Sequence, residues 1–380
     1  MRSLTSRSRM TVGAVATAWT AIAIAVAPPL VTVALADVPP GLTGTPDRPM
    51  QPQHAFKCQK MVNKGIASYL ATLSKTYTKC VDGIAACVQT KASDPTCLMK
   101  AADACNAGIP NLGDDTDKAA GTVFENLVTT FCRSLSPTEL FDDVGGPRFS
   151  LITDACKNRF IQNLESCLFL EANCAAEKLL LVQMPRAHDL LVTAGVTIGH
   201  ALDPQRSCLM DEGGAGALGT DPKPGKVLLG CQKAAAKAGV SFAAKARGAF
   251  AKCADAVMNC AQVKRTQKCV DGAAKTCAKQ IATVDDAQTK LGDKITKACE
   301  KTPIDDLLGA SGGDAGALAT LCNGVGVASV TNLVDYGTCL ARHERCQVED
   351  SIRFTVPRID EFSTVTLQPS PFGSAFCPAP

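Results

Sequence analysis

Ten cysteines recur in the same order in the two halves of this chain, and this repeat constrains the fold more than any other feature. The first series runs from Cys58 to Cys208, with successive intervals of 22, 7, 10, 8, 27, 24, 11, 7 and 34 residues. The second runs from Cys231 to Cys377, with intervals of 22, 7, 9, 8, 22, 23, 17, 7 and 31. Self-similarity of this kind indicates an internal duplication. We therefore predict two tandem homologous domains, residues 58–208 and 231–377.

Shorter motifs recur in register with the cysteines. Cys-Gln-Lys at 58–60 returns at 231–233, and Ser-Pro-Thr-Glu at 136–139 returns as Thr-Pro-Ile-Asp at 302–305. The second motif is typical of a helix start, with a hydroxyl N-cap, a proline at the first position and an acid at the third. Residues 37–57, rich in Pro, Gly and Gln, predict a flexible lead-in, and the Gly- and Pro-rich residues 209–230 predict a linker.

The opening of each domain predicts a long helix. Residues 58–87 and 231–260 are rich in Ala and Lys and lack proline. On a continuous helix the three sulfurs of each stretch fall within about 40° of one another, and the lysines fall about 200° to 300° away from the first sulfur. We predict a mainly all-α fold in which the lysines form a solvated face. One or two short strands in each domain also fit, because Thr364–Leu367 alternates like a strand.

The cysteines predict disulfide bridges. The chain has 20 of them, an even number, and none stands in a C-x-x-C motif that would indicate zinc or redox chemistry. Two cysteines about two turns apart on each arm of a helical hairpin would form a ladder of two bridges. The remaining six cysteines of each domain allow 15 pairings, which spacing leaves open. The predicted hairpin pairs are Cys80–Cys105, Cys87–Cys97, Cys253–Cys277 and Cys260–Cys269.

Residues 1–36 predict a secretory signal peptide. Three arginines precede an uncharged, largely apolar run, and Ala34-Leu35-Ala36 supplies a small-x-small cleavage site. Removal of these residues lowers the formal net charge from +3 to zero. We therefore expect a secreted or periplasmic protein, without a membrane span after cleavage and without the overall field that attracts nucleic acid.

One family resemblance can be given. The Cys-Gln-Lys opening of an Ala/Lys helix, together with a Cys-x2-Glu element that leads into Pro-Arg at 185–186 and 357–358, resembles uncharacterised exported, cysteine-rich helical repeat proteins of bacteria. The resemblance covers most of residues 58–377. It implies export and repetition, and it implies no activity.

Two motifs are of catalytic or nucleotide-binding type. Gly309–Gly313 matches G-x-S-x-G around Ser311, and Asp335 and His343 follow in hydrolase order. A nucleophile elbow needs a strand before it and a helix after it in a large sheet, so a Gly-rich turn is the favoured interpretation. Gly214–Gly219 matches G-x-G-x-x-G, but no strand precedes it, and the prolines at 222 and 224 argue against the helix that would hold a pyrophosphate.

The remaining polar candidates are histidines, acids and two arginines. The four histidines lack metal-ligand spacing, and the acidic cluster at 114–117 lacks the glycine and twelfth-position acid of a calcium loop. We therefore expect no metal and no cofactor. Arg186 with Asp189 recurs as Arg358 with Glu361. Each arginine could bind a ligand carboxylate or form an internal salt bridge, and we favour the salt bridge.

These observations favour an exported structural or protein-interaction protein without catalytic activity. The alternative is a binding module for a small apolar ligand or lipid, because disulfide-braced helices can enclose an apolar cavity. The third hypothesis is a hydrolase that uses Ser311 and His343. The partner is accordingly either an unknown protein or a small apolar ligand.

Overall fold

The described part of the protein is helical. The computed structural model describes residues 52–109, 120–141, 146–152, 161–198, 208–367 and 370–377, and these residues form helices without a strand. The predicted mainly α class is confirmed, but the suggested strand at Thr364–Leu367 is wrong. Residues up to Thr366 belong to helix α12 (Ile359–Thr366), because Ile359, Phe362 and Thr366 bury one face at helical spacing. No described helix combines the length and apolarity needed to span a bilayer.

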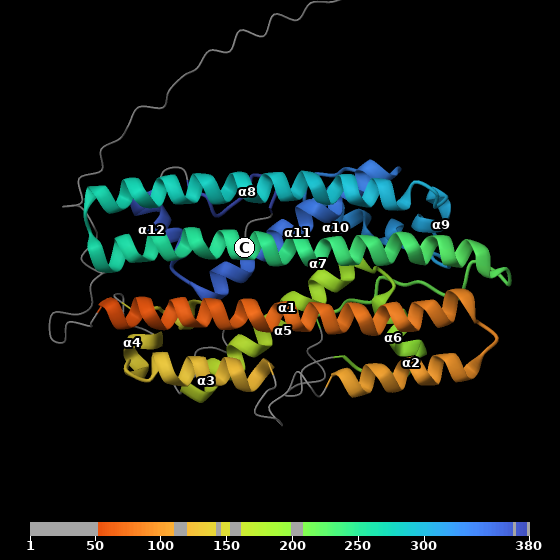
Figure 1. Ribbon diagram of the computed structural model, residues 1–380, viewed down its shortest axis with the longest axis horizontal. Coiled ribbons are helices and arrows are strands. Elements are labelled where there is room, and N and C mark those ends of the chain that lie inside the picture. Colours follow the sequence, from red (N-terminus) through yellow and green to blue (C-terminus); the bar gives the residue numbers. More distant parts are fainter. Residues whose placement is uncertain are drawn as a thin grey trace, which may run out of the picture. The chain divides into compact units, whose positions relative to one another are not determined.

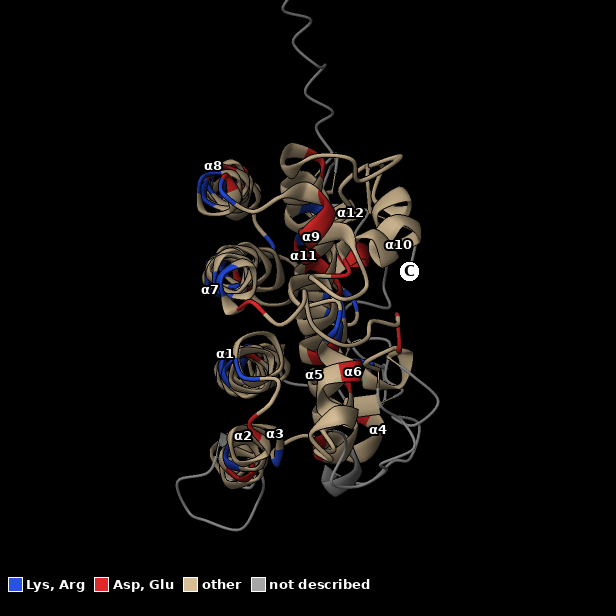
Figure 2. Cartoon of the chain, turned by 90° about the vertical axis from the view of Figure 1, so that its right-hand side faces the viewer, with Lys and Arg blue, Asp and Glu red and all other residues tan. Residues whose placement is uncertain are grey.

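Two long antiparallel helices form the centre of one layer (Figures 1 and 2). They are α1 (Pro52–Thr90) and α7 (Pro222–Met258), which pack side by side. Beside α1 lie α2 (Pro95–Gly108) and α3 (Ala120–Cys132), and beside α7 lies the continuous helix α8 (Gln267–Cys299). The layer therefore consists of α2 and α3, α1, α7 and α8 in that spatial order.

A second layer covers the inner side of these helices (Figure 2). Its main members are α5 (Ile161–Gln183) and α11 (Leu333–Thr355), which contact each other as well as α1 and α7. The shorter elements are α4 (Pro137–Phe141), η4 (Phe149–Leu151), α6 (Ala187–Thr193), the π-helical turn η7 (Asn259–Lys264), α9 (Ile304–Leu308), η8 (Ala315–Leu318), α10 (Ala319–Gly324) and α12. A long helix, a hairpin partner, a short helix, a 3-10 turn, a second long helix and a final short helix thus follow one another in each half. A duplication would produce this order, and the duplication itself remains a prediction.

Helices α1 and α7 begin earlier in the chain than the sequence predicts, and each begins with a proline. Asp221 is the N-cap of α7 and accepts a hydrogen bond from the Lys223 amide at 2.9 Å, while Pro222 occupies the first turn. Proline is well suited to this position, because it lacks only an N–H that would stay unpaired in any case. The interpretation of Pro222 and Pro224 as helix breakers is therefore wrong. Helix α7 starts inside the predicted linker 209–230, and α1 starts inside the predicted lead-in 37–57.

The recurring Pro-acid motif caps one helix but not its counterpart. At α4 the Ser136 amide donates to the Glu139 carboxylate at 2.6 Å, and the Glu139 amide donates to the Ser136 hydroxyl at 3.3 Å. This is the reciprocal capping box that the sequence predicts. At α9 the hydroxyl of Thr302 is buried and makes no hydrogen bond, and the helix begins after Pro303. The predicted cap at Thr302 is therefore wrong.

The two halves share their hydrophobic cores. The core of the second half includes Leu179 and Val182 from α5, while the core of the first half includes Ala236 from α7 and Phe354 from α11. All described residues belong to one compact unit. Each half therefore completes the apolar packing of the other, and the domain boundaries near 208 and 231 are not gaps between separate cores.

Candidate functional site

The structure contains the four bridges expected across the two helical hairpins. Each joins a long helix of the first layer to its hairpin partner, with Cα–Cα distances between 4.6 and 5.6 Å that suit an unstrained disulfide. The pairs are those that spacing predicts: Cys80–Cys105, Cys87–Cys97, Cys253–Cys277 and Cys260–Cys269.

The structure also pairs cysteines that spacing left open. The bridges at the starts of the two halves correspond to each other, as do those at their ends, and Cys167 is bonded as well. No described cysteine is a free thiol, and the described residues contain no group of three or more side chains that could hold a metal. The described sulfur therefore serves cross-linking. The further bridges are Cys58–Cys132, Cys231–Cys299, Cys174–Cys208, Cys346–Cys377 and Cys322–Cys339.

Arg186 forms the internal salt bridge and also reaches the other half of the chain. Its guanidinium lies 2.6 Å from the Asp189 carboxylate and donates to the carbonyls of Ser311 at 3.1 Å and Gly312 at 3.3 Å. The side chain is only 3% exposed. Arg186 is therefore buried against the turn that the G-x-S-x-G pattern marks, where it is unavailable to a soluble ligand.

Arg358 makes the reciprocal contact. It pairs with Glu361 at 2.6 Å and donates to the Gly146 carbonyl in the first half at 3.2 Å. Backbone carbonyls of a glycine-containing turn thus receive an arginine from the opposite half in both cases. A hydrogen bond to a charged donor contributes about 1.5–3 kcal/mol, so these contacts help to hold the halves together.

The glycines of the Ser311 turn have a steric role. A Cβ atom at Gly312 would lie 1.8 Å from the carbonyl oxygen of Asp306, and one at Gly313 would lie 2.5 Å from that of Leu307. The turn therefore packs directly on the backbone of α9. This close approach explains the glycines of the motif without catalysis.

The hydrolase residues are not linked by hydrogen bonds in the described part of the chain. The Asp335 carboxylate accepts from Thr331 and Asn332 at the start of α11. His343 is buried, its Nδ1 has no partner, and desolvation together with the nearby Lys178 lowers its pKa to about 4. The Ser311 carbonyl accepts from Arg186. The acid is therefore engaged at the start of α11, and Nδ1 of the base has no hydrogen-bond partner.

The other histidines and acidic residues considered in the sequence do not come together in one described site. His188 lies 3.4 Å from Asp211, and the described His54 lies in the first turn of α1. His200 and the acidic cluster at 114–117 lie outside the described residues.

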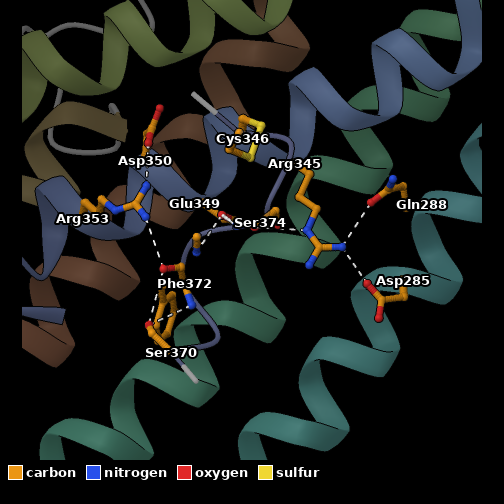
Figure 3. Close-up of polar contacts among 12 residues, drawn as sticks. Asp285, Gln288, Arg345, Cys346, Glu349, Asp350, Arg353, Ser370, Phe372 and Ser374 are labelled. Atoms are coloured by element: carbon orange, nitrogen blue, oxygen red, sulfur yellow. Dashed lines mark hydrogen bonds and ion pairs between the residues drawn. A yellow bond between two sulfur atoms is a disulfide. The ribbon is translucent and has the colours of Figure 1, made fainter. Parts of the chain in front are cut away.

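Glutamates of the Cys-x2-Glu element have a role that the sequence did not predict. Glu349 is fully buried and accepts from the amides of Gly373 at 3.1 Å and Ser374 at 3.0 Å, and from Arg345 at 3.1 Å (Figure 3). Glu177 likewise accepts from the amides of Cys208 and Leu209. Each carboxylate thus fixes the segment that carries the last cysteine of its half. The recurrence of a glutamate three residues after both Cys174 and Cys346 is the sequence feature that could have indicated this role.

A groove of about 830 Å³ lies between α8, α11 and the C-terminal segment. Helices α8 and α11 lie close together at Gly337, where a Cβ would be 3.5 Å from the Gly292 backbone. Arg345 crosses the groove wall to Asp285 at 2.6 Å (Figure 3), and Phe376 lies with its ring centre 5.5 Å from that guanidinium. The groove is open and its walls are charged, so it does not resemble an apolar ligand cavity.

The outer face of the first layer is basic. In Figure 2 the basic residues of α1, α7 and α8 gather on the sides that face away from the second layer. On α1 and α7 the exposed lysines fall within about 120° of arc, and the acids on these helices are Asp82 and Asp255. We call these lysines the lysine face: Lys57, Lys60, Lys64, Lys75, Lys79, Lys223, Lys226, Lys233, Lys237, Lys245 and Lys252.

Asp82 and Asp255 lie along the seam between α1 and α7. Burial raises the pKa of each carboxyl to about 6, and a lysine of the opposite helix partly opposes this shift. Lys233 acts on Asp82, while Lys60 lies 3.9 Å from Asp255. At neutral pH both carboxylates are ionised, and Lys245 lies 3.9 Å from a third acid, Asp286 of α8, so the eleven lysines still outnumber the acids beside them.

A narrow slot separates α1 from α7 near their midpoints. It encloses about 30 Å³, and small side chains of both helices line it above α5 and α11. Arg247 lines the slot, is 4% exposed and donates to the Asn63 carbonyl at 3.2 Å and to the Ser351 hydroxyl. Desolvation lowers its pKa to about 9. Sequence patterns do not single out this buried cation, because Arg247 stands between Lys245 and Lys252 on the same basic helix.

No protein-family model, curated protein or solved structure matches this chain. Its function therefore has to be argued from its own geometry.

Proposed function

We propose that this chain is an exported, non-enzymatic protein that docks reversibly onto an anionic lipid surface through the lysine face. The main support for this proposal is the separation of charge within the fold, with eleven exposed lysines on one side of α1 and α7. The zero net charge expected after signal cleavage conceals this separation. Extensive disulfide bonding supports export, because such bridges persist in oxidising compartments.

The composition of the face favours lipid over a protein partner. Protein–protein interfaces are enriched in aromatic residues and Arg and depleted of Lys. The lysine face has the opposite composition, and its ammonium groups sit on flexible stems that tolerate irregular spacing of anions. Its extent also suits a planar partner, since a 39-residue helix is about 58 Å long and neighbouring helices lie about 8–10 Å apart.

The expected strength is moderate and depends on salt. Each Lys near an anionic membrane contributes about 1 kcal/mol. If about five of the eleven lysines reach the headgroups together, they contribute about 5 kcal/mol, and 0.5 M salt should abolish most of it. The side-by-side packing of α1 and α7, and the bridges from each helix to its own hairpin partner, hold the lysine positions in place, so little ordering cost opposes binding.

The test is cosedimentation with vesicles. Vesicles containing 30 mol% phosphatidylglycerol in phosphatidylcholine should retain the protein at 50 mM salt, and pure phosphatidylcholine vesicles should not. A triple variant of the face, with Lys64, Lys75 and Lys237 replaced by Gln, should bind at least tenfold more weakly. The matched control changes the net charge equally at exposed positions off the face, with Gln at Arg133, Lys178 and Lys301.

Three results would contradict the proposal. The first is equal loss of binding in the face and control variants, and the second is absence of binding to the anionic vesicles. The third is retention by a linear sulfated polysaccharide but not by vesicles, which would assign the face to a polymer. A catalysed reaction lost on Ser311→Ala would instead revive the hydrolase hypothesis.

The apolar-carrier alternative receives less support from the geometry. The groove beside α8 has charged walls, including Asp285, Asp293 and Lys297. The slot at Arg247 encloses only about 30 Å³, roughly the volume of one water molecule. Neither space could bury a drug-sized apolar ligand, which requires about 300 Å³ or more of apolar cavity.

A further inference from the structure

We propose that the slot between α1 and α7 binds one small monovalent anion, a chloride ion or a carboxylate group, against the guanidinium of Arg247. This site is separate from the lipid docking of the lysine face, and neither proposal requires the other. The inference rests on the burial and bonding of Arg247, on the further donors that line the slot and on the size of the slot.

The first observation is a buried positive charge without a counterion. No described carboxylate lies within salt-bridge distance of Arg247, and its Nε–H has no hydrogen-bond acceptor. Its acceptors are the carbonyl and side-chain oxygens of Asn63 and the hydroxyl of Ser351, all of them neutral. A buried ion is costly unless an opposite charge accompanies it. An anion in the slot would supply that charge.

The second observation is that further donors line the same slot. Ser74, with its hydroxyl, and Gln347, with its side-chain amide, line the same slot as Arg247. The rest of the lining includes short apolar side chains, such as Ala67 and Ala243, which add no acceptor. The slot therefore offers N–H and O–H donors and no carboxylate, which is the chemistry of an anion site.

The third observation is access from a positive surface. Ala71 and Ala244, on opposite sides of the slot, are exposed, so the slot opens beside them. Lys75 lies one turn beyond Ala71, and Lys245 follows Ala244 directly. Anions are therefore concentrated at the opening.

The size of the slot selects the ligand. A volume of about 30 Å³ holds one water-sized group, so a chloride or a carboxylate group fits and a sulfate does not fit without movement of the helices. The charge agrees with the size, since a single arginine balances a single negative charge. In the alignment of the two halves the position of Arg247 corresponds to Ser74, so the slot contains one cation and not two.

The test measures anion binding directly, by the line width of the 35Cl NMR signal in chloride buffer with the full mature protein. The native protein should broaden the signal, acetate should compete with chloride, and sulfate at equal ionic strength should compete at least tenfold more weakly. Arg247→Met should abolish the broadening, since a Met of similar length keeps the packing. Lys252→Met is the matched control on an exposed position of the same helix and should keep it.

A second variant guards against misfolding of Arg247→Met. Gln347→Glu would place a carboxylate in the slot while Arg247 remains, so it should remove chloride binding and make the urea midpoint independent of chloride. Equal broadening by the native protein and Arg247→Met would overturn the proposal, as would equal competition by sulfate. Vesicle binding should be unchanged in Arg247→Met, which separates failure of this site from failure of the lysine face.

Discussion

Replacing Asp255 with Asn should stabilise the protein at neutral pH, although the substitution removes a visible ion pair. Burial raises the pKa of this carboxyl from an ordinary value of 3.8 to about 6, even with Lys60 nearby. The Lys60 Nζ lies 3.9 Å away on a side chain that is 50% exposed, and an exposed pair of this kind contributes little. One carboxylate oxygen of Asp255 is buried without a hydrogen bond. Desolvation therefore outweighs attraction.

The sign and size follow from proton linkage. Between pH 3.8 and 6 the folded protein keeps the proton that the unfolded chain loses, so stability falls as the pH rises through this window. About two pKa units at about 1.4 kcal/mol each give an upper bound near 3 kcal/mol. Because 28% of the side chain is exposed, we expect about 1–2 kcal/mol after solvent screening. The Asn side chain avoids this cost at every pH.

The assay is urea unfolding with intact disulfides at pH 4, 6 and 7.5. Asp255→Asn should match the native protein at pH 4 and exceed its stability by about 1–2 kcal/mol at pH 7.5. Asp82→Asn should stabilise the protein with the same pH dependence. The stabilisation of the two substitutions should be additive, because the two sites lie about 33 Å apart along α1 and α7. Asp286→Asn is the control, since hydrogen bonding to Lys290 lowers the pKa of that exposed carboxyl. A less stable Asp255→Asn protein at pH 7.5 would refute the reasoning.

Three further predictions concern the contacts and disulfides that hold the fold together. Arg358→Met should cost about 1.5–3 kcal/mol in urea unfolding, because the buried Gly146 carbonyl loses its charged donor while Glu361, 39% exposed, can be hydrated, and Arg358→Lys should not restore the loss since it cannot form the paired contacts. Gly312→Ala should cost about 1–3 kcal/mol through its clash with α9, whereas Gly248→Ala, at an open helix position, should gain about 0.5–1 kcal/mol. Peptide mapping without reduction should link Cys167 to Cys156, which lies outside the described residues but corresponds to the partner of Cys339; any other partner would contradict the duplication.

Local contacts were predictable from the sequence, and long-range ones were not. The hairpin bridges depend on matched intervals on two adjacent helices, so spacing alone selects them. The contact of Arg186 with Ser311 spans 125 residues, and the local sequence around neither residue predicts the other as its partner. The sequence showed that Arg186 recurs as Arg358, but only the fold shows that each enters the opposite half.

Position along the helix decides the effect of a proline. Proline breaks a helix in its interior, but Pro222 stands at the first turn of α7, where Asp221 caps the helix. The spacing of the lysines predicts a face on each long helix, and the fold places the exposed lysines of α1 and α7 on one side. The net charge of the whole chain does not contain this arrangement.

The alignment of the halves also separates frame from function. Positions that match, such as Arg186 with Arg358 and Glu177 with Glu349, make the same contacts twice and hold the two halves and their last cysteines in place. Ser74 and Arg247 occupy matching positions of the predicted repeat but differ in charge: Arg247 is buried without a counterion, its guanidinium donates to Asn63 and Ser351, and its Nε–H has no acceptor. A buried charge without a counterion costs stability, and the anion proposed for the slot would offset that cost.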